Sequence, residues 1–141
     1  MLKTQLMMSS KTYFIDIDGT IVKHVSNDDL DTITIIKNLS EDNPNYEGNI
    51  FTDFHEILLP GVKEFWASLN EKDKIIITTA RKESHRALTE KIFKDNGLRY
   101  DVLLMDLASG PRILINDTPD MMYKKAIAIN VKRDDGFWFS N

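Results

Sequence analysis

The stretch Thr12–Asp18 reads Thr-Tyr-Phe-Ile-Asp-Ile-Asp, is followed by Gly19, and decides how the fold is organised. Its β-branched and aromatic residues predict a buried strand over residues 12–17, and the Asp-Gly pair predicts a turn directly after it. Asp16 stands among apolar neighbours, where a carboxylate is expensive to bury without a partner. Asp16 and Asp18 are two residues apart, so on an extended strand they point to the same side. We therefore expect a strand that delivers two carboxylates to one place.

Further strands and helices are predicted on both sides of this sequence. The near-continuous apolar runs are typical of parallel strands, and the other segments carry apolar residues at helical spacing. Alternation of strands and helices predicts an α/β domain with a parallel sheet covered on both faces, in a three-layer Rossmann-like arrangement. The predicted strands are residues 74–79, 102–105, 112–115 and 126–129, and the predicted helices are residues 62–69, 84–96 (with Gly97 at its end) and 119–125.

Residues 23–59 interrupt this alternation. They carry eight acidic and two basic residues, a net charge of −6. We interpret them as an insertion with little structure of its own, a hairpin or a helix around Leu30–Leu39. Because the insertion starts shortly after Asp18 in the sequence, we expect it to form a short flap over the two carboxylates rather than a separate domain. A solvated loop that faces away from them is the alternative.

The composition limits the class of protein. With 141 residues, 42% hydrophobic and 28% charged, the chain suits one globular domain over residues 1–141. The absence of cysteine excludes disulfides, thiolate zinc sites and cysteine nucleophiles. A net charge of −4 weighs against nonspecific nucleic-acid binding. No apolar run approaches the ~20 residues of a membrane span, and Met1–Ser10 lacks the apolar core of a secretory signal. We expect a cytoplasmic protein.

Polar residues follow three of the predicted strands. In open parallel sheets, ligands bind beyond the carboxyl ends of the strands. Asp16 and Asp18 stand at the end of the first strand, Thr79 and Ala80 at the end of the second, and Asp117 after the strand at 112–115. Converging carboxylates repel one another unless a cation lies between them, and this all-oxygen set suits Mg²⁺. The Thr79 hydroxyl could donate to a phosphate, although an ordinary β-branched strand residue is the alternative.

Other conspicuous residues have simpler interpretations. The three histidines show no ligand spacing and are expected at the solvated surface. The methionine pairs are expected to pack or to mark an alternative start. The aromatic terminus is expected to pack over a sheet edge or to contact another copy in a homo-oligomer. These residues are His24, His55, His85, Met7–Met8, Met121–Met122 and Phe137–Phe139.

Three motifs resemble those of the haloacid dehalogenase-like (HAD) superfamily. The sequence Asp-Ile-Asp-Gly-Thr-Ile at residues 16–21 resembles the first motif. Residues 75–81 resemble the second, with Thr79 as the counterpart of its threonine, and residues 113–117 resemble the fourth. Their order and spacing fit, and the likeness covers about residues 11–131.

The resemblance implies a HAD-like fold with strand order 5-4-1-2-3 and a Mg²⁺-dependent phosphatase. Asp16 would be the nucleophile and Asp18 the general acid and base. Mg²⁺ would be held by Asp16, the backbone carbonyl of Asp18, and Asp117. The substrate would be a small phosphomonoester, for example a sugar phosphate. The phosphate would meet Thr79, Ala80 and Arg112.

Two features depart from the family pattern. No lysine precedes the fourth motif; Arg112 stands there instead. The second acidic residue of the fourth motif, Asp120, comes three positions after Asp117 rather than four, and Asn116 replaces a carboxylate found in some members. Other candidates for the lysine's role are Lys82, Lys91 and Lys94.

Two alternatives to a small-molecule phosphatase stay open. The first is a phosphatase that acts on nucleic-acid ends, which the acidic charge weighs against. The second is a domain that binds metal and phosphate without turnover, which Asn116 and the missing lysine favour.

Overall fold

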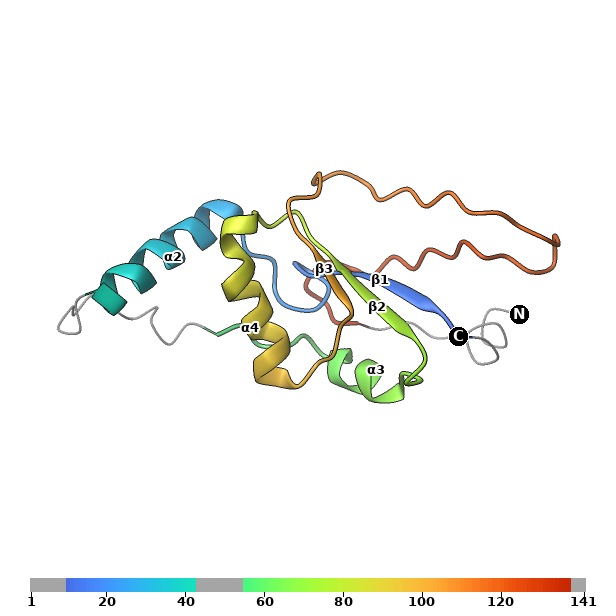
Figure 1. Cartoon of the computed structure of the whole chain (residues 1–141), viewed down its shortest axis with the longest axis horizontal. Helices are drawn as coiled ribbons and strands as arrows, with labels where there is room; N and C mark the ends of the chain where they lie inside the picture. Colours follow the sequence, from blue (N-terminus) through green and yellow to red (C-terminus); the bar gives the residue numbers. More distant parts are fainter. Residues whose placement is uncertain (1–9, 43–54, 138–141) are drawn as a thin grey trace.

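The structure is a computed structural model, and it describes residues 10–42 and 55–137 (Figure 1). Within these ranges it is an α/β fold with a parallel sheet, as predicted. Its elements are β1 (Thr12–Asp16), α2 (Asn27–Asp42), α3 (Val62–Ser68), β2 (Lys74–Thr78), a 3₁₀ turn η1 (Glu83–His85), α4 (Arg86–Asn96) and β3 (Val102–Leu104).

The three strands form one parallel sheet in the order β1-β2-β3. Phe14 pairs with Ile76, which in turn pairs with Val102, so these three side chains form a row across one face. The same register places Asp16 beside Thr78 at the carboxyl end of the sheet. The sequence predicted all three strands, and the boundaries differ by one residue.

One face of the sheet is covered and carries the core. Ile15, Ile75 and Ile77 are buried there with Trp66 of α3 and Phe93 of α4. On the opposite face Phe14 is 54% exposed, Val102 42% and Leu104 40%. We call Phe14, Ile76, Val102 and Leu104 the open face. The sequence predicted a sheet covered on both faces. Within the described residues, one face is covered and the other is not.

The helices that cover the core begin and end close to where the sequence placed them. Helix α4 ends at Gly97, whose φ of +63° is the left-handed conformation that favours glycine at this position. The helix begins at Arg86, after η1, rather than at 84. Gly19 also has a positive φ, +84°, and a Cβ there would lie 2.9 Å from Cγ of Arg133. The turn after β1 therefore requires glycine.

Residues 108–130, which we call the arm, differ from the prediction. The structure has no strand at 112–115 or 126–129 and no helix at 119–125 within this described segment. Every residue of the arm is exposed, including Ile113 at 85% and Ile115 at 91%. An apolar run forms a strand only where it can pair with a neighbouring strand and pack against a covering layer. The arm has neither, because it extends away from the sheet (Figure 1).

The insertion contains the helix that the sequence suggested. Helix α2 extends that prediction to Asn27–Asp42. The insertion closes at its base, because Val22 bridges Leu58 in antiparallel fashion. On α2, Leu30 and Ile33 pack against Leu88 of α4, which fixes the helix to the domain. Whether the insertion covers the site stays a prediction, and residues 43–54 lie outside the described ranges.

The remaining predictions had mixed outcomes. Phe137 packs on Phe65, with ring centroids 4.6 Å apart, as an aromatic over the core. Met121 and Met122 do not pack, being 83% and 67% exposed on the arm. Residues 138–139 and Met7–Met8 lie outside the described ranges. None of the helices within the described ranges has the length and apolar character that a membrane crossing requires.

Candidate active site

The carboxyl ends of β1 and β2 bring the first two motifs together. Asp16 is the last residue of β1 and pairs with Thr78, the last residue of β2. Thr79 continues next to β3, where its N–H donates to the Leu104 carbonyl at 3.0 Å. Because all three strands are parallel, their ends share one edge of the sheet. The juxtaposition expected from the sequence is present for these two motifs.

Asp16 occupies a partly buried position at this edge. The Thr20 hydroxyl donates to its Oδ2 at 3.2 Å. Burial raises the pKa of Asp16, while hydrogen bonds from Thr20 and the Ile17 backbone oppose the rise without cancelling it. The negative charge of Asp18 adds to the rise, and the positive charge of Arg112 reduces it. A carboxylate here is poorly compensated, so a cation beside it would stabilise its charged form.

Asp18 is bound by Arg81 from the loop after β2. Nε of Arg81 donates to Oδ2 of Asp18 at 3.0 Å, and Nη2 donates to Oδ1 at 2.8 Å. The Val25 N–H donates to the same Oδ1 at 3.3 Å. This two-point pairing holds the carboxylate in one orientation.

Arg81 also binds Glu56, the residue that brings the insertion back to the domain. Nη2 donates to Oε1 of Glu56 at 2.6 Å and Nη1 to Oε2 at 3.0 Å. The side chain of Arg81 is 1% exposed and that of Glu56 6%. Burial alone would lower the pKa of Arg81, but the hydrogen bonds to both carboxylates raise it above its ordinary value. One buried guanidinium therefore joins the first motif, the second motif and the insertion.

The two phosphate-binding candidates of the second motif lie beside this cluster. Thr79 is 1% exposed, and its hydroxyl accepts a hydrogen bond from the Arg81 N–H at 3.1 Å. The Ala80 carbonyl accepts from the Asn27 amide at 3.2 Å, which ties the loop to α2. These contacts give Thr79 a structural role in shaping the loop, and its binding of phosphate stays a prediction.

The third phosphate-binding candidate, Arg112, lies at the base of the arm. Its Nη1 donates to the carbonyls of Ala108 and Gly110, at 2.6 and 2.8 Å. Its charge nevertheless acts on Asp16, whose pKa it lowers. Arg112 is thus close enough to this edge to contribute positive potential.

The predicted metal ligands do not come together. Asp117 is 68% exposed on the arm, where its Oδ1 lies 3.3 Å from the Lys125 ammonium. Within the described ranges no three histidine or carboxylate side chains gather as a metal site would need. This conformation does not fit Mg²⁺ held by Asp16, the backbone carbonyl of Asp18, and Asp117, and the magnesium site stays a prediction.

One histidine differs from its prediction. His85 is buried, 2% exposed, because α2 packs over η1. Its Nε2 lies 2.8 Å from Oδ1 of Asp31, and its Nδ1 lies 3.3 Å from the Thr34 hydroxyl. The expectation of a solvated histidine was wrong here: the polar residues of α2 provide partners that allow the ring to be buried.

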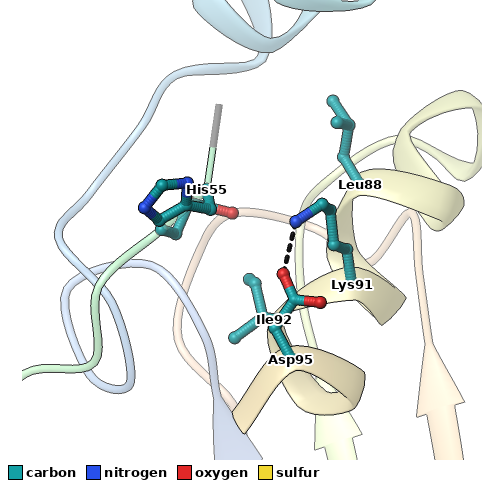
Figure 2. Close-up of a pocket in the computed structure, with 6 residues that line it drawn as sticks. His55, Leu88, Lys91, Ile92 and Asp95 are labelled. Atoms are coloured by element: carbon teal, nitrogen blue, oxygen red, sulfur yellow. Dashed lines mark hydrogen bonds and ion pairs between the residues drawn. The ribbon is translucent and has the colours of Figure 1, made fainter. Parts of the chain in front are cut away.

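A small cavity lies between the end of the insertion and α4 (Figure 2). Its volume is about 10 Å³, room for at most one water molecule. Lys91 and Asp95 pair on one side of it and His55 lies opposite, while Glu56 also lines the cavity. The cavity is too small for a substrate, so it does not compete with the β1 edge as the candidate site.

Two residues of the cluster were assigned no role from the sequence. Arg81 belongs to the second motif, but a charged residue type does not predict a buried side chain. Glu56 precedes the apolar residues Ile57–Leu59 and carries no periodic signal. The only hint was electrostatic: an arginine and an aspartate at adjoining strand ends are natural partners.

Comparison with known proteins adds little. No family model and no curated protein matches the chain. One solved structure, "Structure of Pnkp1/Rnl/Hen1 complex", is similar with a TM-score of 0.44 and 18% identity. The match covers 76% of this chain and 31% of that chain, so the chain spans about a third of its length.

Proposed function

We propose that the protein is a phosphatase of the HAD-like type, acting on a small phosphomonoester through Asp16. The observation that carries the proposal is the pair of carboxylates after β1, with Asp16 poorly compensated and Asp18 held by Arg81. Strand order β1-β2-β3 matches the last three positions of 5-4-1-2-3. The rest of that order and a third layer belong to the proposal.

The proposed reaction has two steps that share these carboxylates. An Asp16 oxygen attacks phosphorus, the bond from phosphorus to the ester oxygen breaks, and the departing oxygen takes a proton from Asp18. A water molecule then attacks the aspartyl phosphate, Asp18 takes its proton, and phosphate leaves with Asp16 restored. Asp18 must therefore hold a proton at the start of the first step and release it within that step.

Arg81 holds Asp18 during both steps. Its two hydrogen bonds fix the orientation of the Asp18 carboxylate, and its bonds to Glu56 tie the same guanidinium to the insertion. We propose that this shared arginine keeps Asp18 in one orientation throughout the reaction. Arg81 and Glu56 are positioning residues in this account.

Mg²⁺ is the proposed cofactor, and it would supply positive charge beside the phosphate when bound. A small substrate with one phosphate is favoured over nucleic acid, because the chain carries a net charge of −4.

A second candidate is a domain that binds phosphate without turnover. It is favoured by the pairing of both Asp18 oxygens with Arg81, which leaves no free carboxylate oxygen for proton transfer. Turnover distinguishes the two candidates directly.

The test is hydrolysis of an aryl phosphate, with and without Mg²⁺, by the wild type and three variants. We expect Asp16→Asn to reduce the rate to background, because an amide cannot attack phosphorus. Asp18→Asn should lose about 10²–10⁴-fold, the usual contribution of general acid–base catalysis. Asp95→Asn, an exposed carboxylate paired with Lys91, is the matched control and should keep full activity. Wild-type turnover no higher than background would favour the binding domain.

A further inference from the structure

A side chain of the insertion is bound to the backbone of the loop that follows β2. The amide nitrogen of Asn27, Nδ2, donates to the Ala80 carbonyl at 3.2 Å. Its oxygen, Oδ1, accepts from the Lys82 N–H, also at 3.2 Å. These two backbone groups are the ones that a neighbouring parallel strand would bind at this point of the chain. The Asn27 amide therefore takes the place of a strand beside residues 80–82.

The other side of this loop is bound to the segment that follows β3. The Thr79 N–H donates to the Leu104 carbonyl at 3.0 Å, and the Thr79 carbonyl accepts from the Leu107 N–H at 3.0 Å. The Arg81 carbonyl accepts from the Asp106 N–H at 2.8 Å. Successive residues of an extended segment direct their backbone groups to alternate sides. Because residues 79 and 81 bind the β3 side, the residue between them directs its backbone groups to the β1 side.

The Ala80 N–H is the donor that this arrangement leaves for a ligand. Ala80 is half-buried, and its carbonyl is held by Asn27. Within the described residues nothing accepts from the Ala80 N–H. It lies on the β1 side of the loop, the side on which Asp16 ends its strand. A partly buried N–H without an acceptor is uncommon, and a phosphate oxygen would satisfy it with a charge-assisted hydrogen bond.

The Asn27 side chain is not needed to begin α2. Ser26 caps that helix, because its hydroxyl accepts from the Asp29 N–H at 3.1 Å. The helix is fixed to the domain by Leu30 and Ile33, which pack against α4. Asparagine also has a low helix propensity. The two hydrogen bonds to the loop after β2 are thus what this residue provides.

We propose that Asn27 is a positioning residue for phosphate binding, which fixes the peptide at Ala80 so that its N–H is directed at a phosphate oxygen beside Asp16. The inference rests on the proposed function, in which the phosphate meets Thr79 and Ala80. A donor that is fixed in advance binds more tightly, because less conformational freedom is lost when the ligand arrives. The insertion then contributes to the site through its first helical residue, whether or not it covers the site.

The test measures the affinity for inorganic phosphate by isothermal titration calorimetry, with Mg²⁺ present. Asn27→Ala is expected to weaken binding about tenfold, since a hydrogen bond to a charged group is worth that much or more. With an aryl phosphate, KM should rise by a similar factor while kcat stays close to wild type, because the N–H binds substrate and transition state alike. Thr32→Ala is the matched control on the same helix: Thr32 is exposed and bonds only to the Asp28 carbonyl, so this variant should bind like wild type.

A nuclear magnetic resonance titration reports on the donor itself. The Ala80 amide proton of the isotopically labelled wild type should move downfield as phosphate is added, and in Asn27→Ala the midpoint should lie about tenfold higher in phosphate. Asn27→Asp is the second variant, because aspartate suits the first turn of a helix and preserves the fold. Its carboxylate faces the Ala80 carbonyl, so it should bind phosphate more weakly than Thr32→Asp, which adds the same charge elsewhere on α2.

The outcomes separate this inference from the proposed phosphatase. An Ala80 amide that does not shift in the wild type, wild-type phosphate affinity in Asn27→Ala, or an equal loss in Thr32→Ala would each overturn the inference. The expected shifts and affinities in a protein without turnover would support the inference and contradict the phosphatase. Turnover with unchanged Asn27 variants would do the reverse.

Discussion

Arg81 binds Asp18 through two hydrogen bonds, from Nε at 3.0 Å and from Nη2 at 2.8 Å, and the guanidinium is almost completely buried. The same group also binds Glu56. The cluster thus has one positive and two negative charges away from water. Its balance depends on Arg81 alone, because either carboxylate would lose its charged partner if the arginine were replaced.

Arg81→Met should destabilise the fold. Removing one partner of a buried ion pair typically costs about 3–5 kcal/mol, because the remaining charge is left uncompensated. Adding Glu56→Gln to Arg81→Met should recover part of the lost stability, because it removes one of the two carboxylates that are left without a positive partner. Urea unfolding measures both variants. Lys91→Met, which removes a 43% exposed lysine side chain paired with Asp95, is the control and should change little. A stability equal to wild type for Arg81→Met would contradict the burial described here.

Asp16→Asn should raise the melting temperature at neutral pH. Burial raises the pKa of Asp16, so folding favours its protonated form. The stability linked to that proton is fully present below the pKa of the unfolded chain and is lost as the pH rises through the pKa of the folded protein. The Asp16→Asn variant does not lose stability in this way. Its gain in melting temperature over the wild type should therefore shrink as the pH falls below about 4, the ordinary range of aspartate pKa values. Calorimetry at several pH values checks this, with Asp95→Asn expected to show no gain.

Asp117→Ala should raise the Mg²⁺ concentration needed for activity much more than Asp120→Ala. In the sequence Asp117 directly follows the apolar run 112–115, whereas the carboxylate of Asp120 accepts a hydrogen bond from Met122 N–H within the turn at the tip of the arm. Magnesium titrations of initial rate compare the two variants. Equal effects would show that the fourth motif has been misread.

Neutralising Asp28 and Asp29 tests whether the insertion forms a flap over the site. Both lie in the first turn of α2 and belong to an insertion of net charge −6. If the insertion lies over the site, Asp28→Asn/Asp29→Asn should improve kcat/KM for a bisphosphate more than for a monophosphate. The gain should shrink with added salt, which screens charges beyond about 8–10 Å. Asp31 is left unchanged, because it pairs with Lys82 and holds His85. No change with either substrate would mean that the insertion faces away.

The parts of this fold that the sequence predicted are those whose signal is local. Residues 12–16 and 74–78 are apolar and β-branched, and each buries a face against α3 and α4, so pattern and environment agree. Gly97 ends α4 because a left-handed residue was needed there. The two carboxylates of the first motif meet the second motif because parallel strands end at one edge.

What the sequence could not predict depends on distant partners. The run Arg-Ile-Leu-Ile at 112–115 resembles the Lys-Ile-Ile-Ile that begins β2, yet no described strand pairs with it. His85 is buried only because Asp31 and Thr34 arrive from α2. Glu56 reaches Arg81 across 25 residues, and no local pattern marks such a pair.

The central claim is that Asp16 becomes phosphorylated during turnover. The wild type is mixed with an aryl phosphate and Mg²⁺, quenched in acid during the steady state, and examined by intact-protein and peptide mass spectrometry. The account predicts one added phosphoryl group, on the peptide that contains Asp16, and none in Asp16→Asn. Turnover without any phosphorylated protein, or a phosphoryl group found on another residue, would contradict it.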